Sequence, residues 1–329
     1  DYRYTGEVDG ELDEGRGEGS FTTPDIGPTS FRFAAGSCSR TGTNAAVFDS
    51  IAAEDPLFFL QLGDLFYDNI DRASRSPFDE AFDRHLTAPG PAALYRDTPI
   101  AYVWDDHDYG PNDADGSSPT RDVAREVFRD VVPSHELAVA DDGPIHRAFT
   151  IGRVRFVVTD TRSARDGSTM LGEEQLAWLL DELVAAGESH ALVVWANPTP
   201  WVGEASATSD LWAGRAAERA LIADEIEAAG IDNLLMVSGD AHMLAFDDGT
   251  NTGYGSADDP GFPLVHAAAL DRPGNEKGGP YSGGTFPGGG QYAVFDVADD
   301  GENIVVHVRG TTWDGEVLID ETLDFTPDR

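Results

Sequence analysis

The stretch Leu57-Phe58-Phe59-Leu60-Gln61-Leu62, followed directly by Gly63-Asp64-Leu65-Phe66-Tyr67, decides the fold class. Its first six residues form an apolar run that predicts a β-strand. The polar cluster that follows begins with a glycine, which allows the backbone to turn sharply at the strand end. Strands that end in such clusters are typical of α/β proteins, whose sites form at the carboxyl ends of strands.

The same alternation of apolar runs and amphipathic stretches continues on both sides of this segment. Apolar runs predict strands at 31–36, 57–62, 99–104, 145–151, 153–159, 191–196 and 232–238. Apolar residues at three- and four-residue spacing predict helices at 44–53, 77–87, 119–131, 173–186 and 215–229. Three further strands are predicted at 291–297, 303–309 and 316–323. The pattern predicts an α/β fold with two sheets in a single domain, residues 1–329.

Two segments depart from this alternation. Residues 1–30 are rich in Gly and Glu, and we expect an extended arm or an edge strand there. Residues 243–290 are rich in Gly, Pro, Asp and Asn, and we expect a long irregular insertion. A loop of that length inside a compact domain is usually functional or mobile, so the insertion is predicted to lie near the site.

Charge is the unusual feature of the composition. The 329 residues include 60 Asp and Glu against 22 Lys and Arg, which gives a formal charge of −38, and Lys277 is the only lysine. This balance argues against a nucleic-acid-binding surface, because affinity for phosphate backbones needs clustered cations. Adaptation to high salt explains the charge best, since salt screens the self-repulsion. An ordinary acidic secreted enzyme is the alternative.

The sequence also bears on the location of the protein. A single cysteine, Cys38, excludes an intrachain disulfide. No apolar run reaches the length of a transmembrane helix. The numbering begins at Asp1, so we expect that an export signal was removed and that the protein is extracellular or on the cell surface. A monomer is expected.

Four predicted strands end in short polar clusters. They are Gly36-Ser37-Cys38-Ser39, Gly63-Asp64-Leu65-Phe66-Tyr67, Trp104-Asp105-Asp106-His107-Asp108 and Ser238-Gly239-Asp240-Ala241-His242. Taken singly, Cys38 could be a small buried apolar residue, Asp64 the N-cap of a following turn and His242 a core histidine. Together, the four clusters bring thiol, carboxyl, phenol and imidazole groups to strand ends that can converge. This combination predicts a metal site.

These motifs resemble the PhoD-type alkaline phosphatases, within the calcineurin-like metallophosphoesterases. The Gly-Ser-Cys stretch ending at Cys38 replaces the first Asp-x-His of the wider superfamily, as in PhoD-type enzymes. Further matching segments are Gly-Asp-x-x-Tyr at 63–67, Trp-Asp-Asp-His at 104–107, Gly-Asp-x-His at 239–242, Thr-Asp-Thr-Arg at 159–162 and the segment 170–179. The resemblance covers about residues 31–310. It implies a four-layer αββα sandwich of two mixed β-sheets flanked by helices.

The resemblance also implies two unlike metal sites. The ligands of the first are Cys38, Tyr67, His242 and a bridging Asp64, a set that suits Fe(III). The ligands of the second are Asp106, Asp240, the same Asp64 and Asn197, all oxygen donors. That set suits Ca²⁺, with Mn²⁺, Mg²⁺ or Zn²⁺ as other possibilities. Asn197 precedes a proline, however, and such a pair also occurs in plain turns.

In the resembling family, a hydroxide bound by the metals attacks the phosphorus atom, and no protein nucleophile is needed. The resemblance places His107 beside the leaving oxygen, where imidazole can donate a proton. A structural pairing of His107 with Asp105 or Asp108 is the alternative. Arg162 could bind phosphate with its planar fork or form a structural ion pair. Further candidates for shaping the site or adding a cation ligand are Tyr109, Asn112 and Asp113.

The function expected from these observations is metal-dependent hydrolysis of small phosphate esters, by a phosphatase or phosphodiesterase. A non-catalytic calcium-binding secreted or surface protein is the alternative, although such a protein has no use for Cys38, Tyr67 and His242 as ligands. A serine hydrolase of the α/β type is disfavoured, because the sequence contains no Gly-x-Ser-x-Gly motif. The sequence leaves open whether monoesters or diesters are preferred.

Overall fold

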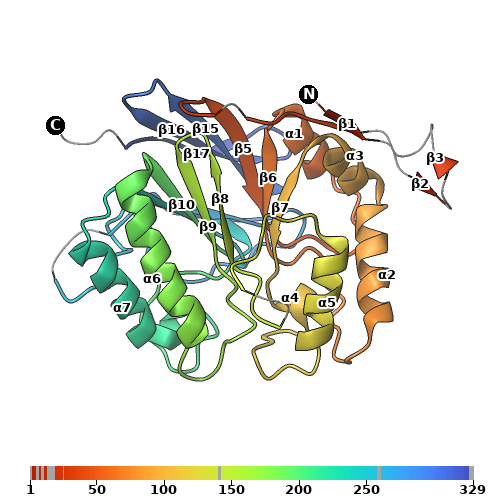
Figure 1. Ribbon diagram of the computed structural model, residues 1–329, viewed down its shortest axis with the longest axis horizontal. Coiled ribbons are helices and arrows are strands. Elements are labelled where there is room, and N and C mark those ends of the chain that lie inside the picture. The colour runs from red at the N-terminus through yellow and green to blue at the C-terminus, as the bar shows by residue number, and fades with distance from the viewer. Residues whose placement is uncertain are drawn as a thin grey trace.

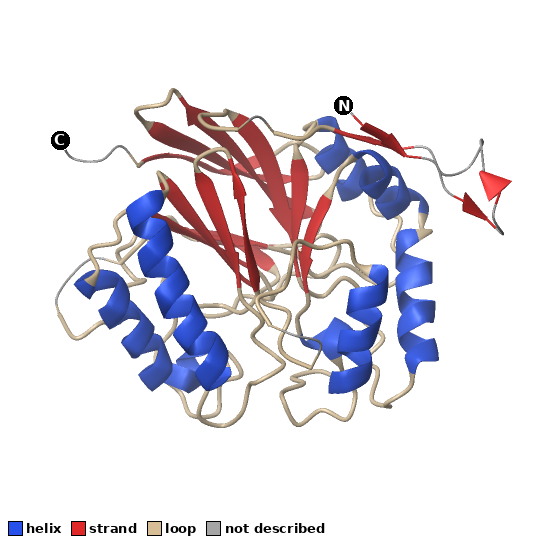
Figure 2. Ribbon diagram, viewed as in Figure 1, coloured by secondary structure: helices blue, strands red, loops and turns tan. Residues whose placement is uncertain are grey.

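The computed structural model describes the chain except residues 1, 5–6, 9–10, 13–18, 25, 140–141, 258–260 and 326–329. Two mixed β-sheets pack face to face, with helices on the outside (Figures 1 and 2). The α/β class and the predicted four-layer αββα sandwich are confirmed. No helix in the described part of the chain combines the length and apolar character needed to cross a membrane.

The first sheet has seven strands. Their spatial order is β14 (Thr285–Pro287), β12 (Met243–Asp247), β13 (Leu264–Ala267), β11 (Leu234–Ser238), β10 (Leu192–Asn197), β9 (Val154–Val158) and β8 (Arg147–Ile151). The four strands β13, β11, β10 and β9 run parallel, and the others are antiparallel to their neighbours. Four carboxyl ends therefore meet at one edge of this sheet.

The second sheet has six strands. Their spatial order is β17 (Val317–Asp324), β16 (Ile304–Thr312), β15 (Gln291–Asp299), β5 (Phe31–Gly36), β6 (Phe58–Leu62) and β7 (Ile100–Val103). The strands β5, β6 and β7 are parallel, whereas β15, β16 and β17 form an antiparallel meander. Three parallel carboxyl ends thus lie next to one another in this sheet.

Helices cover the outer faces. On the first sheet lie α6 (Gly172–Ser189) and α7 (Ala216–Ala228), preceded by the short 3-10 helix η1 (Trp212–Arg215), and on the second lie α1 (Val47–Ala53) and α3 (Pro89–Asp97). Beside β7, α2 (Arg75–Leu86) packs against α5 (Arg121–Val131), and the short α4 (Asp106–Tyr109) follows β7 directly. In α6, Leu179, Leu183 and Ala186 are buried, as the three- and four-residue spacing predicts.

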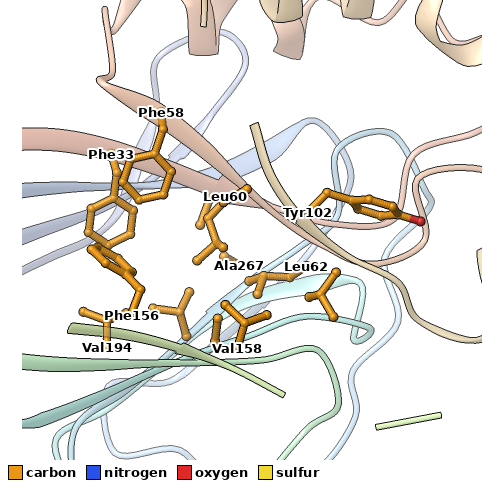
Figure 3. Packing of buried hydrophobic residues seen from close by; sticks show 14 of the residues in the cluster. Phe33, Phe58, Leu60, Leu62, Tyr102, Phe156, Val158, Val194 and Ala267 are labelled. Carbon is orange, nitrogen blue, oxygen red and sulfur yellow. The ribbon is translucent and has the colours of Figure 1, made fainter. Parts of the chain in front are cut away.

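The core between the sheets explains the apolar strand runs. In β6, Leu60 points into the space between the sheets, while Phe59 points out against α1 and α3. In β9, Phe156 lies in the same inner core and Val157 packs under α6 and α7. Figure 3 shows the inner residues of the two sheets meeting across this layer. Strands that are covered on both faces need apolar residues at successive positions.

Two segments differ from the expectation. Residues 243–290 are not wholly irregular, because they contain β12, β13 and β14, which extend the first sheet beyond β11. Residues 1–30 contribute short strands that pair with one another: β1 (Tyr2–Tyr4) with β4 (Gly19–Phe21), and β2 (Glu7–Val8) with β3 (Glu11–Leu12). Among the described residues, none of these strands is an edge strand of a main sheet, and part of the predicted arm lies outside the described residues.

Candidate metal centre

The carboxyl ends of parallel strands from both sheets bring the polar clusters together. Cys38 follows β5, Asp64 follows β6, Asp106 follows β7 and Asp240 follows β11. In Figure 1 the lower ends of the central strands run into the loops around α4. The convergence expected from the sequence is therefore present, with each cluster leaving its own strand.

Two glycines allow these ends to approach closely. A Cβ atom on Gly63, whose φ is +86°, would lie 2.4 Å from the Cβ of Asp105. A Cβ atom on Gly239 would lie 2.5 Å from the carbonyl oxygen of Leu62, which belongs to the other sheet. A side chain at either position would force the strand ends apart. Gly63, which precedes Asp64, and Gly239, which precedes Asp240, thus determine how closely the polar clusters approach one another.

The first predicted ligand set forms a compact group around Asp64. The hydroxyl of Tyr67 donates to Asp64 Oδ2 at 2.6 Å and lies 3.1 Å from His242 Nε2. The Sγ of Cys38 lies 3.6 Å from the same carboxylate oxygen. One ligand atom each from Cys38, Asp64 and His242 fall within 4.8 Å of one another. The opposite ring atom of His242, Nδ1, lies 3.0 Å from the carbonyl oxygen of Pro273, which orients the imidazole.

The second group consists of carboxylates. Oxygens of Asp64, Asp105, Asp106 and Asp240 lie within 4.8 Å of one another. Within the described part of the chain, Oδ2 of Asp105, Oδ1 of Asp106 and Oδ2 of Asp240 are buried without a hydrogen-bond partner. Buried carboxylate oxygens without donors are costly unless a cation binds them. These orphaned oxygens therefore fit a hard cation, and Asp105 joins the set that the sequence predicted.

Asp64 is shared by the two groups. Its Oδ2 lies against Tyr67 and Cys38, while its Oδ1 accepts a hydrogen bond from the backbone N–H of His107 at 3.3 Å. The whole residue is 1% exposed. A carboxylate placed between a thiol, phenol and imidazole set and an all-oxygen set has the position required of a bridge.

Three of the proposed ligands adopt a backbone conformation that side chains rarely occupy. The φ angles are +63° at Cys38, +53° at Asp64 and +67° at Asp240. The left-handed region is disfavoured for residues with a Cβ, and glycine is its usual occupant. Strain of this kind clusters at functional sites, where the surrounding structure holds it in place.

The electrostatics of the site are dominated by buried acidic groups. Burial, together with the neighbouring carboxylates, raises the pKa of Asp64 well above its usual value. Burial and the charges of Asp64 and Asp240 likewise raise the pKa of the Cys38 thiol. The pKa of the Tyr67 phenol is raised by burial and by the same two neighbours, Cys38 and Asp64. A bound metal cation would favour the charged forms of all three, so the donor set suits cations.

The pKa values of Asp106 and His242 are lowered, in contrast to those of Asp64, Cys38 and Tyr67. Burial opposes ionisation of Asp106, but Arg162 and His107 lower its pKa to about 2. Burial, followed by the charges of Lys277 and Arg272, lowers the pKa of His242 to about 4. The imidazole is therefore neutral near pH 7, which is the form that binds metals.

His107 lies at the rim of this centre. Its ring centroid is 4.0 Å from that of Tyr67, and its Nδ1 lies 2.7 Å from Oδ1 of Asn69. The amide oxygen of Asn69 can only accept a hydrogen bond, so Nδ1 carries the proton. In the neutral imidazole Nε2 is then the unprotonated nitrogen. The structure therefore pairs His107 with Asn69. It does not pair His107 with Asp105 or Asp108, because both carboxylates have other partners. Asp105 pairs with Arg162, and Asp108 accepts hydrogen bonds from the Leu65 N–H and the Tyr102 hydroxyl.

Arg162 lies behind the carboxylates. Its side chain is fully buried, and its Nε donates to Oδ1 of Asp105 at 2.6 Å. Its Nη2 is 3.8 Å from Oδ1 of Asp106. This placement favours the structural ion pair over the phosphate-binding role that the sequence also allowed.

Asn197 is fully buried at the end of β10. Its Oδ1 accepts a hydrogen bond from the indole of Trp212 at 3.1 Å, and its Nδ2 donates to the carbonyl of Thr199 at 2.8 Å. These partners orient the amide, and its membership of the oxygen set stays a prediction. Of the three candidates after His107, Asp113 contacts a proposed ligand, since its N–H donates to Oδ2 of Asp106 at 2.6 Å, whereas Tyr109 packs against Trp104 and Asn112 is exposed.

Sequence reasoning missed three residues at this centre. Asn69 gave no signal, because no pattern marks an asparagine two residues beyond Tyr67. Arg272 and Lys277 come from the segment that was predicted to be irregular. The guanidinium of Arg272 lies 4.0 Å from the centre of the Tyr67 ring, and Nζ of Lys277 lies 2.8 Å from Oδ1 of Asp240. Only the rarity of lysine in this chain could have drawn attention to Lys277.

Comparisons with known proteins agree with this fold. Residues 33–267 match the model of the PhoD-like phosphatase family. Among curated proteins, none matches the chain. The solved structure of PhoD is similar, with a TM-score of 0.65 and 16% identity over 95% of this chain and 75% of that one.

Two further structures share the fold. A purple acid phosphatase from yellow lupin seeds has a TM-score of 0.62 and 14% identity, covering 93% of this chain and 56% of its own. A dimetal phosphatase from Danio rerio has a TM-score of 0.50 and 13% identity, covering 90% of this chain and 99% of its own. At these identities the likeness establishes the fold. The family match spans residues 33–267 of the 329, and this chain belongs to the PhoD-like phosphatase family.

Proposed function

We propose that the protein hydrolyses phosphate esters at a centre of two unlike metal ions. The observation that carries the proposal is the position of Asp64 between two donor sets of different chemistry. Cys38, Tyr67 and His242 supply sulfur, phenol and imidazole, which suit Fe(III). Asp106 and Asp240 supply carboxylate oxygens, which suit Ca²⁺. Asn197 completes the second set in the proposal.

Bound cations at such a centre supply the charge that ionises a water near neutral pH and neutralises the phosphate oxygens. The chain's own residues fix the geometry for that chemistry. Gly63 and Gly239 set the spacing of the carboxylates, and Arg162 holds Asp105 in place. His107 donates its Nδ1–H to Asn69, so its other ring nitrogen, Nε2, donates a hydrogen bond or a proton to the leaving oxygen in the protonated, imidazolium form.

The test is reconstitution of metal-free protein. Chelation should abolish hydrolysis of p-nitrophenyl phosphate and of its bis ester. Addition of Fe(III) and Ca²⁺ together should restore it, and either ion alone should restore much less. Full activity without metal would refute the proposal. Stoichiometric Ca²⁺ binding with no hydrolysis of either ester would instead support the non-catalytic calcium-binding alternative. The extracellular location and the monomeric state stay predictions.

A further inference from the structure

The segment Asp271–Gly278 brings two cationic side chains, those of Arg272 and Lys277, to a centre rich in carboxylates. Arg272 lies over the Tyr67 ring, and Lys277 forms an ion pair with Asp240. The chain has 22 cationic side chains in all, and Lys277 is its only lysine. A lysine in a protein that otherwise uses arginine presents a compact ammonium where a planar guanidinium would differ in shape and donor geometry.

Backbone contacts hold this segment on both sides of Lys277. On one side, the Asn275 N–H donates to the carbonyl of His242 at 3.0 Å. On the other, the Gly279 N–H donates to the carbonyl of Val202 at 3.3 Å, and a Cβ on Gly278 would lie 2.2 Å from that same carbonyl oxygen. The Tyr281 hydroxyl donates to the carbonyl of Lys277 at 3.2 Å. The lysine is therefore placed by the fold rather than free on the surface.

The ion pair leaves both partners with unused capacity. Lys277 binds Oδ1 of Asp240, whereas Oδ2 of Asp240 belongs to the buried oxygens that lack a donor in the described part of the chain. Asp240 can therefore bind a cation through one oxygen and keep Lys277 on the other. An ammonium has three N–H donors, and Asp240 accepts one of them. The side chain is 28% exposed, so the remaining donors have access to a ligand that enters the centre.

We propose that Lys277 is a specificity-determining residue that binds an unesterified phosphate oxygen and makes this enzyme favour phosphomonoesters over phosphodiesters. The inference rests on the proposed function. A monoester dianion has three unesterified oxygens, whereas a diester monoanion has two and carries an organic group on the third. An extra ammonium beside the carboxylates binds the additional, negatively charged oxygen of the monoester through a charge-assisted hydrogen bond, which a diester cannot form.

The experiment compares Lys277→Met with Lys277→Arg and with the control Arg96→Met, which removes an exposed cation on α3. Methionine keeps most of the length of the stem and removes the charge. All proteins are loaded with metal, and their metal content is measured. Two quantities are then determined: inorganic phosphate affinity by calorimetry, and kcat/KM for p-nitrophenyl phosphate and for its bis ester.

We expect Lys277→Met to weaken phosphate binding and monoester kcat/KM on the order of tenfold, and diester kcat/KM much less. Lys277→Arg should recover part of the loss, and Arg96→Met should behave as the parent protein. Equal losses on both esters, unchanged phosphate affinity, or loss of metal in Lys277→Met would overturn the inference. If the parent protein hydrolyses neither ester, the proposed function fails, while the phosphate titration still decides whether Lys277 binds phosphate.

Discussion

Arg162 and Asp105 form an ion pair 2.6 Å apart in which both side chains are fully buried. Removing one partner of such a pair leaves an uncompensated charge in the interior, at a cost of about 3–5 kcal/mol. We expect Arg162→Met to lower the free energy of unfolding by an amount of that order in urea titrations. Adding Asp105→Asn to the same chain should recover part of the loss. Unchanged stability combined with weaker phosphate binding would instead favour the phosphate-binding role.

Removal of the shared carboxylate should empty both metal sites. Asp64 is the residue common to the sulfur and imidazole group and to the all-carboxylate group. We expect Asp64→Ala to lose both metals and all hydrolysis, as measured by elemental analysis of purified protein. Asp97→Ala, at an exposed carboxylate on α3, is the control and should retain both. Loss of a single metal would show that Asp64 is a terminal ligand.

The colour of the protein tests whether Fe(III) occupies the first metal site, through the hydroxyl oxygen of Tyr67. The hydroxyl of Tyr67 lies 2.6 Å from Asp64 and 3.1 Å from His242, whereas the centre of its ring lies 4.0 Å from the His107 ring and 4.0 Å from the Arg272 guanidinium. A phenolate bound to Fe(III) gives a charge-transfer band in the visible spectrum, so the metal-loaded protein should be coloured. Tyr67→Phe should lose or shift the band and keep the fold by circular dichroism. A colourless, active protein containing zinc would contradict the iron assignment.

Buried histidines should make the fold sensitive to mild acid. His85 is fully buried near Phe48 and Tyr95, and burial lowers its pKa from 6.5 to about 4. The unfolded chain takes up this proton below about pH 6.5, whereas the folded chain takes it up only near pH 4, so acid favours unfolding. Between pH 7 and pH 5 the stability of His85→Leu relative to the parent should therefore improve by up to about 2 kcal/mol. Parallel stability curves for the two proteins would contradict this.

Salt should stabilise the protein. With a formal charge of −38, the folded chain repels itself in dilute buffer. At molar salt the Debye length falls to about 3 Å, which screens exposed charges. We expect the melting temperature to rise steadily from low to molar KCl. A melting temperature that stays flat or falls would contradict adaptation to salt and favour the alternative of an ordinary acidic secreted enzyme.

Much of the fold and the centre could be predicted because the relevant signals are local. The apolar runs of β5, β6, β9 and β10 lie within about a residue of their predicted bounds, since strands covered on both faces carry apolar residues at most positions. The polar clusters after β5, β6, β7 and β11 follow from the rule that sites form at carboxyl strand ends. These two signals are sufficient to predict that Cys38, Asp64, Asp106 and Asp240 lie close together.

Other features depend on contacts that no local pattern records. β12, β13 and β14 are only three to five residues long and lie in a stretch rich in Gly and Pro, so their strand character comes from pairing with β11 and with one another. α3 was missed because its prolines and glycine resemble a loop, although proline is favoured in the first turn of a helix. The orientation of Arg162 was undecidable, since a phosphate ligand and a buried ion pair use the same residue.

The left-handed backbone at Cys38, Asp64 and Asp240 has an evolutionary consequence. Glycine at any of these three positions would relieve a conformational cost of about 1 kcal/mol, so only selection for ligand chemistry keeps the other residues there. A lineage that no longer needed catalysis would drift toward glycine at these sites while the sheets and their core persisted. Glycine at the positions of Cys38, Asp64 and Asp240 is therefore the expected signature of descendants that have become pseudoenzymes.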